Sequence, residues 1–172
     1  MRSFAEERKA KTDQLFMTSP IKLYKVVLGK FLASVTVLIL TLIISFIYPI
    51  ILAILGEPSF GEILTAYIGF LLMGATSIAI GLLLSAITES QVVAAVSTFG
   101  VFFVMLMGST AISFIGSGFI KNALAAISLF DRLADFTSGI LGVSPIIYYL
   151  SITFTVLYTT MKLIEKRRWS GN

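Results

Sequence analysis

Residues 31–56 read FLASVTVLILTLIISFIYPIILAILG, a run without a single charged side chain. Three further windows lack charge in the same way: 63–88, 90–120 and 136–161. A helix needs about 20 apolar residues to cross the hydrocarbon core of a bilayer, and one central Lys, Arg or Asp costs roughly 2.5 to 3.5 kcal/mol. The four windows therefore predict four transmembrane helices, which we place near residues 28–54, 62–87, 91–113 and 143–164.

The overall composition is also that of a membrane protein. Of the 172 residues, 57% are hydrophobic and 13% are charged, and the mean hydropathy is +0.97, whereas soluble domains have about 25% charged residues. Cys and His are absent, which excludes disulfides, thiolate catalysis, Cys/His metal sites and a His general base. The net charge of +4 is concentrated at the two ends, and no folded basic domain remains to bind nucleic acid. We expect no metal, no cofactor and no nucleic-acid partner.

The positive charges predict the orientation in the membrane. More than half of the Lys and Arg residues lie within residues 1–30, and four more follow the last predicted span: Lys162, Lys166, Arg167 and Arg168. The predicted loop at 56–62 has neither Lys nor Arg. Positive residues stay on the cytoplasmic side, and an even number of spans returns the chain to the side where it started. Both termini are therefore predicted to be cytoplasmic.

The segment before the last span, residues 114–142, is predicted to be external. A Gly-Ser-Gly sequence at 116–118 interrupts the apolar run, and an amphipathic stretch with Asp131, Arg132 and Asp135 follows. Irregular backbone persists at membrane depth only where protein or water satisfies its polar groups. We expect two short helices that dip partly into the outer leaflet, with the three charged residues near the outer surface. Their spacing favours a local ion pair over an acid–base site.

Small and polar residues within the spans suggest packing. One face of the second span is predicted to contact another helix, because small residues recur on it: Gly74, Ser77, Gly81 and Ser85. Uncharged polar residues either line a substrate path or, as is more common, pack and bond back to their own helix: Thr36, Thr41, Ser45, Thr76, Ser97 and Thr98. Pro49 is expected to kink the first span. Tyr148, Tyr149 and Trp169 suit positions at the membrane interface.

The N-terminal residues predict two short helices before the first span. Thr12 and Asp13 can cap a helix whose residues include Leu15, Phe16 and Met17, because their side-chain oxygens can accept from free first-turn amides. Ser19 and Pro20 suit the start of the second helix. The charged run Glu6, Glu7 and Arg8 precedes them, and such a run alone most often forms a solvated helix face.

Four sequence runs in this region resemble a known family. They are SFAEER at 3–8, TDQL at 12–15, TSP at 18–20 and LGKF at 28–31. In this order they resemble permease subunits of ABC-2 type exporters, and most closely the gliding-motility and copper-processing branch. Members of the family usually have six spans. The resemblance therefore suggests that this chain corresponds to the last four of them and lacks the first two.

The resemblance implies an all-α, polytopic membrane protein with one transmembrane domain. Its expected parts are a cytoplasmic coupling segment at 1–27 with an amphipathic helix, three transmembrane helices within 28–113, external re-entrant helices at 114–142, and the last transmembrane helix with a basic tail at 143–172. The location implied is the plasma (inner) membrane of a prokaryote.

The resemblance also implies partners and a docking site. An ABC ATPase subunit, in two copies, and a second permease chain, identical or related, would complete the transporter. The residues expected to dock onto the ATPase are Glu6, Glu7, Arg8, Thr12, Asp13, Leu15, Phe16 and Met17. The two glutamates would face basic residues of the ATPase, and the apolar side chains would fill a groove on it.

The expected function is export driven by ATP hydrolysis in the partner subunit. The chain has no P-loop, so we do not expect it to be an enzyme itself. The alternative is a non-transporting membrane anchor or assembly protein, or a truncated remnant of a permease. An ion-coupled carrier is a weaker alternative, because such carriers usually place an ionisable residue inside a span.

Overall fold

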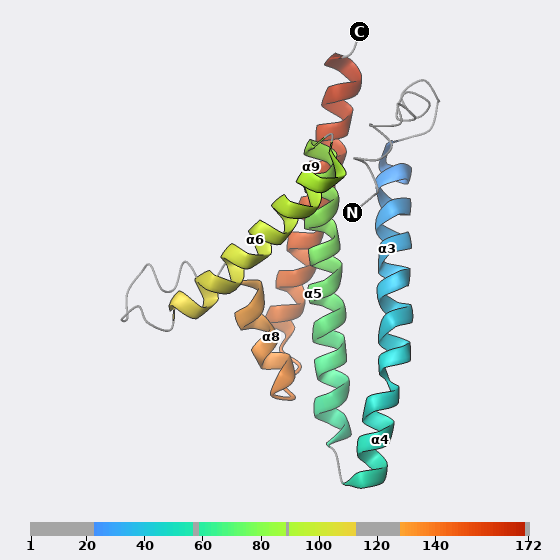
Figure 1. Ribbon diagram of the computed structural model, residues 1–172, viewed down its shortest axis with the longest axis vertical. Helices are drawn as coiled ribbons and strands as arrows, with labels where there is room; N and C mark the ends of the chain where they lie inside the picture. Colours follow the sequence, from blue (N-terminus) through green and yellow to red (C-terminus); the bar gives the residue numbers. More distant parts are fainter. Residues whose placement is uncertain (1–22, 57–58, 89, 113–127, 171–172) are drawn as a thin grey trace. The chain divides into compact units, whose positions relative to one another are not determined.

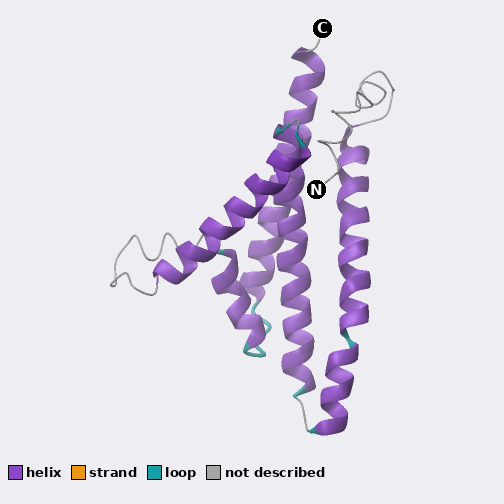
Figure 2. Ribbon diagram, viewed as in Figure 1, coloured by secondary structure: helices purple, strands orange, loops and turns teal. Residues whose placement is uncertain are grey.

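The computed structural model describes residues 23–56, 59–88, 90–112 and 128–170. Within these ranges all regular structure is helical (Figures 1 and 2). The helices are α3 (Leu23–Ser45), α4 (Ile47–Leu55), α5 (Phe60–Ile87), α6 (Gln91–Ile112), α8 (Leu129–Thr137) and α9 (Val143–Ser170).

Within the described residues, four helical stretches are long and apolar enough to cross a membrane. They are Leu23–Leu55, which joins α3 and α4, then Phe60–Ile87, Gln91–Gly108 and Val143–Lys166. The predicted all-helical membrane fold with four spans is thereby confirmed. In the most apolar stretch of α5, 33% of the residues are buried within the protein, compared with 6% in the corresponding stretch of the first span. Of these two, α5 is therefore the helix against which more of the chain packs.

The helix ends follow from local chemistry. At the start of α5, the amide of Ile63 donates to the carbonyl of Ser59 at 3.2 Å. Glu62 lies in the first turn of α5, where a carboxylate interacts favourably with the helix dipole. Beyond α8, Gly139 has φ +78°, and a β-carbon there would lie 2.8 Å from Cγ of Glu62. Glycine thus suits this turn both by its backbone conformation and by its lack of a side chain.

The first span is broken at Phe46, between α3 and α4 (Figure 2). The amide of Phe46 donates to both Leu42 and Ile43, at 3.1 and 3.2 Å. Pro49 follows three residues later and has no amide hydrogen for the carbonyl of Ser45. The kink expected from Pro49 therefore takes the form of a short break one turn before it.

The chain packs as two units. Unit 1 combines Met1–Val37, Ala75–Phe99 and Ser151–Asn172, and unit 2 combines Leu38–Gly74 and Gly100–Leu150. The buried side chains described in unit 1 are Val27, Thr76, Ala79, Leu82, Ser85, Ala86, Ala94, Thr98 and Thr160. In unit 2 they include Leu129, Phe136 and Tyr149. Each unit therefore has a core of its own, and the two cores differ in the size of their side chains.

Candidate functional site

The residues predicted to dock onto an ATPase lie outside the described residues. They are Glu6, Glu7, Arg8, Thr12, Asp13, Leu15, Phe16 and Met17. The described chain begins with α3, on which Tyr24 and Lys25 are exposed. The cationic and aromatic side chains that follow the docking segment are thus on the same helix as the first span. The docking role itself stays a prediction.

The charged residues predicted in the external segment lie on α8. The side-chain oxygen of Ser128 caps this helix by accepting from the amide of Asp131 at 3.2 Å, which satisfies one first-turn donor. Asp135 is exposed. The guanidinium carbon of Arg132 lies 5.3 Å from the centre of the Tyr148 ring on α9, within the range of a cation–π interaction.

Buried groups fix α8 to its neighbours within unit 2. The hydroxyl of Tyr149, on α9, donates to the carbonyl of Leu129 at 2.6 Å, and this bond is buried. The Phe136 ring centre lies 6.3 Å from that of Tyr149. On α5, a β-carbon at Gly69 would lie 2.5 Å from Cβ of Phe136, so only glycine leaves room for the ring. These contacts make α8 a structural element packed along one side.

The predicted small-residue face of the second span lies on α5. At Gly74 a β-carbon would lie 2.6 Å from a methyl group of Leu38, so α3 and α5 approach closely there. Gly81 and Ser85 are buried, and Ser77 is half-buried. A helix contact along the whole face remains a prediction.

Hydroxyl groups in the spans have two kinds of partner. Of the six uncharged polar residues predicted in the spans, three bond to carbonyls of their own helix, as expected in a membrane: Thr36 to Leu32 at 2.9 Å, Ser97 to Ala94 at 3.1 Å and Thr98 to Ala94 at 2.7 Å. Thr76 instead reaches another helix. Its hydroxyl lies 2.9 Å from that of Thr153, which joins α5 to α9 within unit 1.

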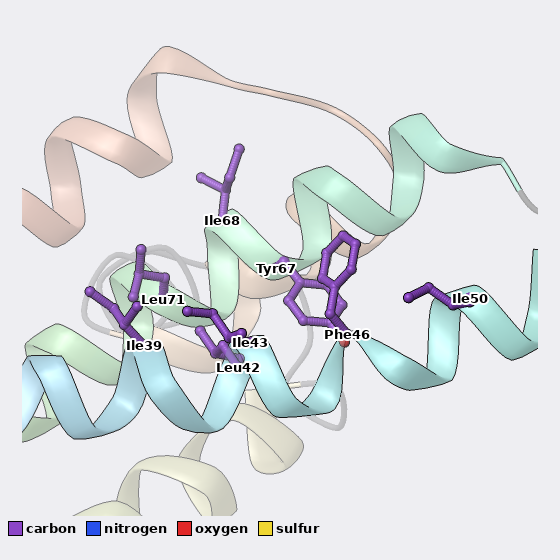
Figure 3. Close-up of a pocket in the computed structure, with 8 residues that line it drawn as sticks. All are labelled: Ile39, Leu42, Ile43, Phe46, Ile50, Tyr67, Ile68 and Leu71. Carbon is purple, nitrogen blue, oxygen red and sulfur yellow. The ribbon is translucent and has the colours of Figure 1, made fainter.

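A second contact between helices lies at the break in the first span. The hydroxyl of Tyr67, on α5, donates to the carbonyl of Ser45 at 3.0 Å and lies 3.1 Å from the Ser45 hydroxyl. The ring of Phe46 meets Tyr67 edge-on, with the centres 5.1 Å apart. Both rings line an apolar pocket of about 580 Å³ (Figure 3). Sequence reasoning missed Tyr67, although Pro49 marked the carbonyl that needed a partner.

The described side chains do not suggest metal chemistry. Among them, no group of three or more Asp, Glu, His or Cys residues is placed to hold a metal ion. The polar groups reported above join helix to helix or bond within one helix. The arrangement is suited to holding membrane helices at defined distances from one another.

Comparisons with known proteins give one family. The sequence matches the model of the ABC-2 family transporter protein over residues 1–167. Comparison with curated proteins and with solved structures gives no significant match. The matched range takes in all four candidate spans. Members of this family form the transmembrane component of a transporter and are not its ATPase. The chain therefore belongs to the ABC-2 transporter family.

Proposed function

We propose that this ABC-2 permease exports a substrate using ATP hydrolysis by a separate ATPase subunit. The family match over residues 1–167, together with the four apolar helices inside that range, carries the proposal. This sequence has no P-loop, and we assign the hydrolytic step to a separate ATPase subunit. The sequence runs at 3–31 favour the gliding-motility and copper-processing branch of the family.

The proposed coupling element is the segment before α3. Leu15, Phe16 and Met17 would insert into an apolar groove of the ATPase, while Glu6 and Glu7 would face its basic residues. A docked helix can transmit the ATPase cycle only if it binds differently to the two ATPase states. The resulting shift would pass directly into the first span, because α3 begins by Leu23.

The proposed assembly contains two ATPase copies and a second permease chain in the plasma membrane of a prokaryote. The basic N-terminal residues and the basic end of α9 support a cytoplasmic location for both termini. In this orientation α8 would lie on the outer side, with Asp131, Arg132 and Asp135 near the surface.

Co-purification tests the coupling proposal. The full chain, isolated from its native membrane in mild detergent, should bring an ABC ATPase in near-equal amount. Replacing Leu15 and Phe16 with Asp should reduce the bound ATPase at least about tenfold, as loss of buried hot-spot side chains does, while leaving membrane insertion intact. Gln14→Asp adds charge in the same segment and should have little effect.

The outcomes separate the candidate functions. Full ATPase association by the double variant would contradict the docking assignment but not the transporter class. If the unaltered chain brings down no ATPase, the non-transporting anchor or assembly protein becomes the better description.

Cysteine labelling tests the orientation, and the natural sequence has no cysteine to interfere. Ser59→Cys should react with a membrane-impermeant reagent added outside intact cells. Ser170→Cys should react only after the cells are opened. The reverse pattern would overturn the proposed topology.

A further inference from the structure

We propose that Tyr67 is a latch on a hinge in the first span. Its hydroxyl holds the Ser45 carbonyl that Pro49 leaves without a helical donor, and release of this bond allows α4 to change its angle at Phe46. The proposal rests on contacts within unit 2 and does not depend on what the protein transports.

Pro49 creates the need for the latch. In an unbroken helix the amide of residue 49 would donate to the carbonyl of residue 45, and proline has no amide hydrogen. An unpaired carbonyl is costly in the hydrocarbon region, because the lipid tails supply no donor in place of the missing amide. The Tyr67 hydroxyl, at 3.0 Å, is the replacement donor. It comes from a different helix, so the repair of one helix depends on the position of another.

One phenol satisfies both polar groups of Ser45. Tyr67 has a single hydroxyl proton, which it donates to the Ser45 carbonyl. The Ser45 hydroxyl, 3.1 Å away, can then donate to the phenol oxygen. The edge-on contact with Phe46 holds the ring in place. Phenylalanine at position 67 would keep the ring contact and lose both hydrogen bonds.

Packing alone holds α4 only weakly. Pro49 is the one buried residue of this helix. Large side chains along the rest of α4 are exposed, up to 80% for Ile54 and Leu55. The bond to Tyr67 lies at the point where α4 meets α3, so it acts directly on the angle between them. A break followed by a lightly packed helix is the arrangement expected of a hinge.

The surroundings of the latch provide a way to open it. A pocket of about 300 Å³ lies beside the bond, and Ser45, Tyr67 and Thr137 contribute polar groups to its lining. A water molecule that enters this pocket can take the place of the phenol on the Ser45 carbonyl. In the apolar pocket of Figure 3, the Tyr67 hydroxyl is the only side-chain hydrogen-bond donor among the described lining residues. We therefore expect the latch to open when water enters the pocket beside Thr137.

A distance measurement in lipid vesicles tests the latch on the full chain. Spin labels on cysteines at Ile54 and Leu150, two exposed positions of unit 2, report the angle of α4. Tyr67→Phe should broaden the distance distribution about twofold, because the hinge then samples more than one angle. Tyr48→Phe removes a hydroxyl from an exposed side chain of α4 and is the matched control.

The decisive comparison uses Pro49→Ala. An alanine amide can bond to the Ser45 carbonyl within the helix, so the latch is no longer needed. Tyr67→Phe should then leave the distribution unchanged in the Pro49→Ala background. Pro145→Ala, in the first turn of α9, restores no helical bond and should not suppress the effect. Equal broadening in both backgrounds, or no broadening by Tyr67→Phe alone, would overturn the proposal.

The test also holds if Tyr67→Phe prevents stable insertion. In that case the double variant Tyr67→Phe/Pro49→Ala should insert normally, because the orphaned carbonyl has regained a donor. Failure of the double variant as well would show that Tyr67 acts in another way and would refute the latch.

Discussion

The two units of the molecule bury different kinds of side chain. No buried side chain described in unit 1 is larger than leucine, whereas the largest ones in unit 2 are the rings of Phe136 and Tyr149. Small side chains allow long membrane helices to bring their backbones close together. The short helix α8 has few residues with which to contact its neighbours, so each buried one has to fill more space. Enlarging a buried side chain should therefore destabilise unit 1 most, whereas removing a large buried side chain should destabilise unit 2 most.

The largest expected effect is the loss of the Phe136 ring in unit 2. Phe136→Ala empties a fully buried position between Gly69 and Tyr149. The free energy of unfolding should fall by about 3 to 5 kcal/mol, the range for a buried Phe→Ala change, measured by detergent-induced unfolding. Phe60→Ala, at a side chain that is 65% exposed, is the control. Similar losses in both variants would remove the distinction between the units.

Added bulk in unit 1 should have the next largest effect. Ser85→Leu places a large side chain at a fully buried position of α5 and should cost about 3 kcal/mol through overpacking. Thr155→Leu adds similar bulk at an exposed position of α9, where surface changes stay within about 0.5 kcal/mol. A stable Ser85→Leu protein would mean that small side chains are not required in this core.

Gly69 is the position where unit 2 itself requires a small residue. Gly69→Ala should cost about 2 kcal/mol, because the new methyl group meets the Cβ atom of Phe136 and the backbone has to shift. Gly100→Ala, on α6, has nothing within 4 Å of the added carbon and should be neutral or slightly stabilising. Combining Gly69→Ala with Phe136→Ala should recover part of the loss, since the clashing side chain is then gone.

The smallest expected effect concerns the hydroxyl pair between α5 and α9. Thr76→Val removes one partner of the 2.9 Å contact with Thr153 and should cost about 0.6 kcal/mol, the average for such bonds between membrane helices. Thr159→Val removes a hydroxyl whose described hydrogen bond lies within α9, to the carbonyl of Thr155 at 2.8 Å. This change should cost less. Equal costs would show that contact across helices adds nothing to bonding within one helix.

The sequence was sufficient to predict features that depend on neighbouring residues along the chain. The lack of charge in four windows predicted four spans, and Pro49 predicted the break in the first one. The sequence pattern also placed Asp131, Arg132 and Asp135 in a short amphipathic segment, which is the helix α8 in the structure. Each of these features is local, because span length, proline chemistry and amphipathic spacing act over a few turns.

Features that depend on the register between helices could not be predicted. Tyr67 meets Ser45 only because α5 and α3 pack in one particular register, which the sequence pattern does not specify. Gly69 was also not predicted as a contact position, because Met73 separates it from the repeat of small residues at Ser77, Gly81 and Ser85. Both positions gain their meaning from a side chain far away in sequence.

The attachment of α8 has a practical consequence. Tyr149 holds this helix through the main-chain oxygen of Leu129, an atom that every residue type supplies at that place. The exposed side of α8, with Ala134 and Asp135, makes no comparable demand on side-chain identity. An epitope or a fluorescent reporter attached at these positions should therefore leave the position of α8 unchanged. This makes α8 a convenient site for labelling the protein.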